Sequence, residues 1–371
     1  MAVPLFDTAT ALAPLRAEID AAVARVIDSG RFILGPEVDA FEREFAAFCG
    51  AHSAIGVANG TDALTIALRA LGVGEGDDVV VPSFTFYASA EAIPPTGARP
   101  VFCDVDPETF CATPDTVRAA LTPRTKAVIA VHLFGNVAPV RAIEALGVPV
   151  IEDAAQAAGS TSTAGRPGAL GELATFSFFP SKNLGCFGDG GAITARDDAL
   201  ADRIRMLRFH GSRDKVRFEH VGYNSRLDEL QAAILRVQLP HLQQWAEGRR
   251  AAARHYEHAG LGELVELPRP VDGTAPAWHL FVVRSEAIED LAAALRRAGH
   301  GHKAYYRTPV HLQPAMRKYA GGIDLPATAE VARTHLAIPM SPALRPSQAA
   351  EVVAALREAS LPVSARVPAP H

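Results

Sequence analysis

The amino-acid sequence predicts an α/β protein with a mostly parallel sheet of about seven strands. From about residue 54 to 195, short runs rich in Val, Ile, Ala and Phe alternate with helical patterns. This alternation is typical of a parallel sheet covered by helices. The strand runs are apolar at nearly every position, as expected for strands buried on both faces. The length of 371 residues accommodates this sheet and a smaller second domain.

Each element follows from a local pattern. The expected strands, bounded by turn residues, are 53–58, 78–81, 100–105, 127–132, 148–152, 175–179 and 192–195. The helical spacing of apolar residues predicts helices at 62–71, 85–94, 113–120, 137–146 and 199–209. Asp115 is placed to assist the start of the third helix, and Gly147 ends the fourth.

The C-terminal third has a different pattern. A long helical region at 227–256 is interrupted at Pro240 and is followed by an isolated strand at 278–283. Two helices with polar faces follow at 288–299 and 348–359. We therefore expect a large domain over residues 1–245 and a smaller α+β domain over 246–371, with a disordered tail from about residue 361.

Composition excludes several classes of protein. Apolar residues make up 49% of the chain and charged residues 21%, as in globular proteins with a substantial core. No membrane-spanning run and no signal peptide is recognised, so we expect a cytoplasmic protein that does not bind membranes. A net charge of −5 without a basic tract predicts no nucleic-acid partner. The four cysteines lack C-x-x-C spacing, so neither a metal site nor a disulfide framework is expected.

The most informative residue is Lys182, in a turn between two apolar runs. A loop lysine is ordinarily a solvated cation, and it becomes a nucleophile only where its surroundings favour the neutral amine. Upstream, Asp153 follows a buried strand at the sheet edge where open α/β sheets bind ligands. Asp153 by itself equally suits the cap of a following helix. Together, Lys182 and Asp153 are the amine and the carboxylate that pyridoxal phosphate requires.

Further polar residues suit the same cofactor. Gln156 can reach the phenolic oxygen of the ring, and the Ser177 hydroxyl points away from its two phenylalanine neighbours toward a phosphate. Ser177 also fits as a small residue in a tight contact. The 59–64 turn joins a strand to a helix start, which is either an ordinary cap or an anion site. Among the aromatic residues after the second strand, we expect Phe86 to stack on the cofactor ring.

Six motifs in order along the chain resemble the DegT/DnrJ/EryC1/StrS family of sugar-nucleotide aminotransferases, from about residue 4 to 356. These are GRFILGPEV at 30–38, NGTDAL at 59–64, EDAAQ at 152–156, FSFFPSKNLG at 176–185, GYNSRLDELQ at 222–231 and PVHLQ at 309–313. The resemblance implies the fold type I architecture of pyridoxal-phosphate enzymes.

The resemblance also implies residue roles. Lys182 would form the imine with the cofactor, Asp153 would pair with its pyridine nitrogen, and Gln156 would lie near its phenolic oxygen. The phosphate cradle implied by the family comprises Gly60, Thr61, Asp62 and Ser177. In a homodimer with shared active sites, Asn224 would reach the phosphate held by the neighbouring subunit. The residues implied to face the sugar nucleotide are Arg226, Tyr305, Tyr306 and His311.

By this analogy an amino acid, L-glutamate, donates its amino group to a keto-sugar nucleotide, and Lys182 moves the proton. The 182–185 motif resembles members that act on 3-keto sugars, either UDP-linked 3-keto N-acetylglucosaminuronate or a dTDP-3-keto-6-deoxyhexose. A 4-keto substrate is the alternative. A related pyridoxamine-dependent sugar dehydratase is a further alternative, but those dehydratases carry histidine in place of the lysine, so Lys182 argues against it. Two further alternatives are a non-catalytic cofactor-binding regulator and a nicotinamide oxidoreductase, and the chain lacks the G-x-G-x-x-G motif of the latter.

Overall fold

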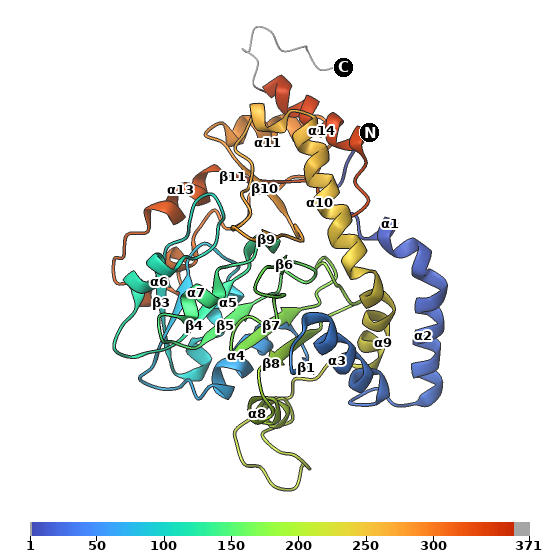
Figure 1. The fold of residues 1–371 in the computed structure, drawn as a ribbon, viewed down its shortest axis with the longest axis vertical. Helices are drawn as coiled ribbons and strands as arrows, with labels where there is room; N and C mark the ends of the chain where they lie inside the picture. Colours follow the sequence, from blue (N-terminus) through green and yellow to red (C-terminus); the bar gives the residue numbers. More distant parts are fainter. Residues whose placement is uncertain (1, 360–371) are drawn as a thin grey trace.

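A seven-stranded sheet forms the centre of the computed structural model, which describes residues 2–359 (Figure 1). The strand order is β1-β8-β7-β5-β4-β2-β3. The strands are β1 (Ser53–Val57), β2 (Asp78–Pro82), β3 (Arg99–Cys103), β4 (Thr125–Val131), β5 (Val150–Asp153), β7 (Leu173–Ser177) and β8 (Gly191–Ala195). All seven predicted strands are present within a few residues.

The sheet is mostly parallel, as predicted. Strands β3, β2, β4, β5 and β7 are linked by parallel pairings, and β8 runs antiparallel to both of its neighbours, β7 and β1. Every residue of β2, β5 and β8 is buried, which explains their apolar sequences. Because β5 and β7 are adjacent and parallel, Asp153 and Ser177 lie at the same edge of the sheet.

The predicted helices around the sheet are present, and two of them are shorter than expected. They are α4 (Gly60–Ala70), α5 (Ala88–Glu91), α6 (Pro114–Ala120), α7 (Val140–Glu144) and α8 (Asp198–Arg208). Helix α5 is followed by a 3-10 turn at Pro94, because proline cannot donate to the helical ladder. Thr113, not Asp115, provides the side-chain cap of α6, through a capping box with Thr116.

Three helices near the N-terminus were not predicted: α1 (Ala9–Leu12), α2 (Arg16–Ser29) and α3 (Pro36–Cys49). Helices α2 and α3 pack against α9 (Glu229–Gln238), which leads through a 3-10 turn into α10 (Leu242–His258) (Figure 1). The expected interruption at Pro240 is this single turn, because proline is tolerated in the first turn of the next helix.

The C-terminal part contains β10 (Phe281–Arg284) paired antiparallel with β11 (His335–Ile338). Helices α11 (Ile288–Arg297) and α14 (Pro346–Ala359) pack with this pair and α10, while α12 (Arg317–Ala320) and α13 (Pro326–Thr334) lie between β10 and β11 in sequence. A short pairing of β6 (Thr161–Ser162) with β9 (Thr274–Ala275) lies between the two sheets.

One hydrophobic cluster joins Val3 to residues between Ala252 and Ala359, whereas Leu280 and Val310 pack into the core of the large sheet. Helix α10 crosses the expected domain boundary at 245, so the two-domain division stays a prediction. The expected disordered tail lies outside the described residues. Within the described range, every helix is too short or too polar to cross a bilayer.

Candidate active site

The carboxyl edge of the sheet brings three predicted residues together: Gly60, Asp153 and Ser177. A side chain on Gly60 would place its Cβ only 2.8 Å from Cβ of Ser177. Such a contact is too short for carbon atoms, so the strand and helix can approach this closely only because residue 60 is glycine. Asp153 ends β5 beside β7, and its backbone carbonyl accepts a hydrogen bond from His132 N–H at 3.0 Å.

The N-terminus of α4 offers donors for an anion. Asn59, which was not predicted to act, is the helix cap, and its Oδ1 accepts the N–H of Asp62 at 2.8 Å. The N–H groups of Gly60 and Thr61 have no acceptor among residues 2–359. These two amides, at the N-terminus of a helix whose first residue lies against Ser177, therefore have free capacity to bind a phosphate.

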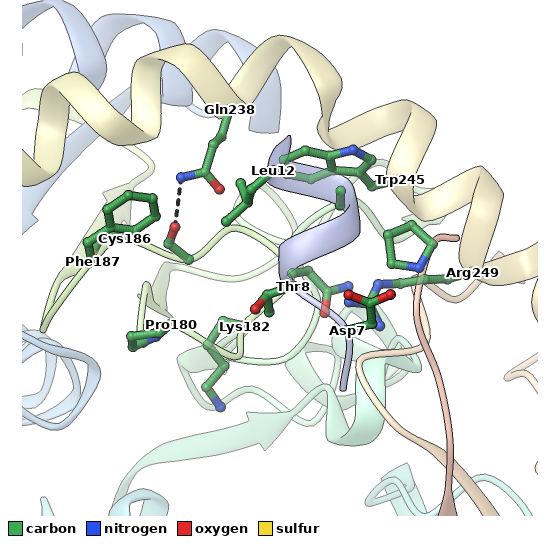
Figure 2. A pocket seen from close by; sticks show the side chains of 14 residues that line it. Asp7, Thr8, Leu12, Pro180, Lys182, Cys186, Phe187, Gln238, Trp245 and Arg249 are labelled. Atoms are coloured by element: carbon green, nitrogen blue, oxygen red, sulfur yellow. Dashed lines mark hydrogen bonds between the residues drawn. The ribbon is translucent and has the colours of Figure 1, made fainter. Parts of the chain in front are cut away.

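Lys182 lies in the turn between β7 and β8. Its backbone N–H bonds to the carbonyl of Phe179 at 2.8 Å, and the turn closes where Phe178 N–H meets the Gly190 carbonyl at 2.8 Å. Figure 2 shows the Lys182 side chain extending away from the side chains of the adjoining pocket. Burial lowers the pKa of Lys182 to about 8, and the Asp153 carboxylate acts in the opposite direction. The amine is therefore partly neutral near neutral pH.

The Asp153 carboxylate is held on both of its oxygens. Ser89 donates its hydroxyl to Oδ2 at 2.7 Å, and the N–H of Ala155 bonds to Oδ1 at 3.2 Å. The Ser89 hydroxyl is itself 3.0 Å from that of Thr85. Asp153 is 6% exposed, and this buried carboxylate is oriented by one hydroxyl and one backbone N–H, with no cation among these bonds.

Gln156 is oriented by two partners. Its Oε1 accepts the N–H of Phe134 at 2.6 Å, so its amide nitrogen faces the hydroxyl of Tyr306 at 3.2 Å. The Tyr306 ring stacks on Phe134 with centroids 6.0 Å apart, and burial raises the pKa of the Tyr306 phenol. Phe86 lies 6.4 Å from the Tyr306 ring and is 54% exposed, so one of its faces is available for stacking.

The other predicted substrate residues lie in different settings. Tyr305 is partly exposed beside Tyr306, with ring centroids 5.8 Å apart. His311 is buried, and its Nδ1 is 2.5 Å from the Ser83 hydroxyl. This ring is therefore engaged within the protein.

Asn224 and Arg226 lie in the segment between α8 and α9. Asn224 is exposed and forms an isolated β-bridge with Phe209. Arg226 is partly exposed and has no ion-pair partner among the described residues. Between them, Ser225 accepts the N–H of Ala58 at 3.0 Å. This bond attaches the segment next to the start of α4.

Two further polar residues at the Lys182 turn were missed from the sequence. The amide nitrogen of Asn183 donates to the carbonyl of Ala277 at 3.0 Å, and its buried Oδ1 has no hydrogen-bond partner among residues 2–359. His279 is also buried, and its Nδ1 has no partner in the same range. Burial, followed by the charges of Lys182 and Arg249, keeps the pKa of His279 well below its usual value. No local sequence pattern marks either residue.

The arrangement fits pyridoxal phosphate. The close contact of Gly60 with Ser177 and the free amides beside it suit a phosphate. The oriented carboxylate of Asp153 suits a protonated ring nitrogen, and the lowered pKa of Lys182 suits an amine that reacts with an aldehyde.

Comparisons with known proteins agree with this fit. A dTDP-3-amino-3,4,6-trideoxy-alpha-D-glucose transaminase of Streptomyces venezuelae is 47% identical over 366 residues, which is 96% of each chain. A UDP-2-acetamido-2-deoxy-3-oxo-D-glucuronate aminotransferase of Pseudomonas aeruginosa is 40% identical over 358 residues, which is 95% of this chain and 99% of the relative.

A solved structure extends the similarity to the fold. The crystal structure of DesV from S. venezuelae, in complex with a ketimine intermediate, matches with a TM-score of 0.93 at 47% identity, over 97% of this chain and 99% of that one. A family model matches residues 14–357. Sequence, fold and site geometry therefore agree that the chain belongs to the DegT/DnrJ/EryC1/StrS aminotransferase family.

Proposed function

We propose that the protein is a pyridoxal-phosphate-dependent aminotransferase that converts a 3-keto-sugar nucleotide into an amino-sugar nucleotide, with an amino acid such as L-glutamate as donor. The observation that carries the proposal is the Lys182 turn beside the buried, hydrogen-bonded carboxylate of Asp153, where burial lowers the pKa of the amine to about 8 and Asp153 acts in the opposite direction. The transaminase names of the S. venezuelae and P. aeruginosa relatives support the substrate class.

Each residue of the proposed cofactor site would contact a different part of the cofactor. When bound, the cofactor supplies an electrophilic carbonyl group and a ring that withdraws electrons. Gly60, Thr61 and Ser177 would hold its phosphate. Asp62 lies in the same first turn of α4 and would take part through its backbone. Asp153 would carry the charge opposite the ring nitrogen, and Phe86 would cover one face of the ring. Gln156 would present its amide to the phenolic oxygen.

Lys182 would move the proton. As a neutral amine, its Nζ accepts a proton from the donor's α-carbon, and as an ammonium it returns one. A pKa of about 8 keeps both forms populated near neutral pH. Because the donor leaves its amino group on the cofactor-loaded enzyme and departs as a keto acid before the keto sugar binds, we expect ping-pong kinetics.

For the sugar nucleotide, we propose contacts from Arg226 and Tyr305, both partly exposed, and from Tyr306, whose hydroxyl Gln156 orients. His311 stays a prediction as a substrate residue, and its bond to Ser83 favours an indirect role in shaping the site. The names of the two relatives contain a dTDP-linked and a UDP-linked sugar, so both nucleotides belong in the test.

We further propose a homodimer in which Asn224 completes the neighbour's phosphate site. The segment between α8 and α9 projects from the sheet in Figure 1 and exposes large apolar side chains. Val216 is 82% exposed, Val221 83% and Phe218 58%. Apolar side chains gathered in this way favour contact with another protein surface. The predicted cytoplasmic location stays a prediction.

Two experiments test the function. Borohydride reduction of the cofactor-loaded protein should attach the cofactor to the peptide that carries Lys182, and Lys182→Ala should abolish turnover. Purified protein should then be assayed with glutamate and a panel of dTDP- and UDP-linked 3-keto and 4-keto sugars. A preference for any 4-keto sugar would overturn the regiochemical proposal. A loaded protein that gives no half-reaction with any amino donor would instead favour the regulator.

The dimer has a separate test. Mixed refolding of Lys182→Ala with Asn224→Ala should restore activity that neither variant has alone, because one hybrid site would then contain both residues. Light scattering should give twice the mass of the chain. A fully active monomer would contradict the shared site.

A further inference from the structure

A cavity of about 130 Å³ lies behind the Lys182 turn. It is bounded by the N-terminal segment with α1, by α10 and by the turn itself, and it is partly open to solvent (Figure 2). The Lys182 side chain extends away from the other side chains that line it. Lys182 belongs both to this lining and to the proposed cofactor site, whereas Asp153, Gln156 and Ser177 are absent from the lining. The cavity therefore adjoins the proposed cofactor site at Lys182 without including those three residues.

The lining contains a buried cation without a counter-ion. Arg249 of α10 is 6% exposed, and its hydrogen bonds to the described residues run from one guanidinium nitrogen to the carbonyls of Trp278 and His279, at 3.1 and 3.5 Å. No carboxylate among the described residues lies within ion-pair distance of it. Burial lowers the pKa of Arg249 to about 10. A buried charge is ordinarily paired, since the unpaired state is costly.

The cavity lining also contains one acidic side chain, Asp7, which is hydrogen-bonded within its own segment. Asp7 accepts the N–H of Thr10 at 3.0 Å through Oδ1. Figure 2 shows Arg249 extending from α10 toward Asp7 and Thr8, and yet no Asp7–Arg249 ion pair is present. The polar remainder of the lining includes Asn183, whose amide nitrogen already donates to the Ala277 carbonyl, and the Thr8 hydroxyl, which can donate to an anion. The cavity thus combines a guanidinium that has no carboxylate partner among residues 2–359 with a hydroxyl donor.

We propose that this cavity binds a small oxyanion, a carboxylate or a phosphate, with Arg249 as its counter-ion. A planar guanidinium with free N–H groups is the side chain best suited to both ligands. The volume exceeds that needed by one water, roughly 10–15 Å³ by the same kind of measure, and it accommodates an ion of the size of acetate or phosphate. Asn183 adjoins both the cavity and Lys182, so the bound ion contacts the turn that carries the catalytic lysine.

Calorimetric titration of the cofactor-loaded protein with sodium acetate and with sodium phosphate tests the site without turnover. Loading the cofactor first fills the phosphate cradle at α4, so that binding at the cradle does not contribute. We expect one ion per chain. Stronger binding of acetate assigns the site to carboxylates, and stronger binding of phosphate assigns it to phosphate. Absence of binding heat for both ions overturns the proposal.

Four variants locate the site. Arg249→Met should weaken binding about tenfold or more, as expected for loss of a charged hydrogen-bond donor. Ala11→Leu leaves the arginine in place and fills the cavity from α1, so it should also abolish binding. Asp7→Asn removes the opposing charge and keeps an acceptor for Thr10, so binding should tighten. Arg250→Met is the control, because Arg250 bonds the Pro276 carbonyl and is not in the lining.

If Arg249→Met fails to fold, Ala11→Leu and Asp7→Asn decide the matter. Binding that is unchanged in Ala11→Leu contradicts the location, and binding that weakens in Asp7→Asn contradicts the sign of the charge. Neither result bears on aminotransferase activity, so failure of this site and failure of the proposed function are distinguishable.

Discussion

The hydroxyl of Ser89 donates to Oδ2 of Asp153 at 2.7 Å, although the two residues are 64 positions apart. Ser89 lies in α5, after β2, while Asp153 ends β5. The bond therefore ties a short helix to the carboxylate on which the proposed cofactor depends. Within residues 2–359 the other oxygen bonds only the N–H of Ala155, at the longer distance of 3.2 Å, so Ser89 is the stronger of the two restraints.

Ser89→Ala should impair catalysis without unfolding the protein. The Asp153 carboxylate would lose a hydrogen bond to a charged group, which is typically worth about 1.5–3 kcal/mol. We expect kcat to fall about tenfold or more, because small displacements of reacting groups are costly. Steady-state kinetics and the visible absorbance of the cofactor check this. Ser162→Ala, which removes an exposed hydroxyl that bonds the Gly165 carbonyl, is the control. Equal kcat in both variants would contradict the role of Ser89.

The pKa of Lys182 predicts how the apoenzyme takes up its cofactor. Only the neutral amine attacks an aldehyde, and the neutral fraction at pH 7 is about a tenth when the pKa is about 8. The rate of cofactor uptake should therefore rise with pH and level off above about pH 8. Stopped-flow absorbance from pH 6 to 10 measures it. A rate that still rises at pH 10 would mean that the lysine is solvated.

Asp153→Asn tests whether the charge of Asp153 changes the pKa of Lys182. The Asp153 carboxylate raises the pKa of Lys182, against the larger effect of burial. Removing the negative charge should lower that pKa further, and the plateau of the uptake rate should move to lower pH. A plateau that moves to higher pH would show that the sign of this interaction is wrong.

The strands and the lysine turn were predictable because their signals are local. Apolar runs end at Asp153 and precede Lys182, and parallel strands bring their carboxyl ends to one edge. Ser89, Asn183 and Arg249 were not predictable, since each meets its partner across 29 to 94 positions of sequence. Such contacts depend on tertiary packing, and no spacing rule marks them. The same reason hides the burial of His311 against Ser83.

Gly60→Ala should weaken cofactor binding. The added Cβ would lie 2.8 Å from that of Ser177, so α4 and β7 would have to separate at the predicted phosphate cradle. We expect a higher Kd for the cofactor, measured by fluorescence titration of the apoenzyme, together with some loss of stability. Gly74→Ala is the control, because its Cβ would have only the Thr96 carbonyl within 4 Å, at 4.0 Å. Equal affinity in the two variants would mean that the cradle lies elsewhere.

The buried carboxylate of Glu152, next to Asp153 in β5, should contribute strongly to the free energy of unfolding. Glu152 is fully buried, and its oxygens accept the N–H groups of Gly168, Leu170 and Gly171 at 2.8–3.2 Å. The fourth partner is His132, whose Nε2 is 2.8 Å away. Because Nδ1 of His132 accepts the N–H of Ala138 at 2.9 Å, the proton of a neutral ring is on Nε2 and points at Glu152.

Glu152→Ala would leave these donors buried without acceptors, so the free energy of unfolding should fall by about 3–5 kcal/mol, as when one partner of a buried pair is removed. Glu152→Gln keeps the shape and replaces one acceptor by a donor, and it should lose less. Urea unfolding of the apoenzyme measures both, with Asp115→Ala, whose pair with Arg118 is exposed, as a control expected to change little. Because Glu152 immediately precedes Asp153 in β5, the alanine variant should also bind the cofactor more weakly. An unfolding free energy for Glu152→Ala within 1 kcal/mol of the wild type would show that water reaches these donors.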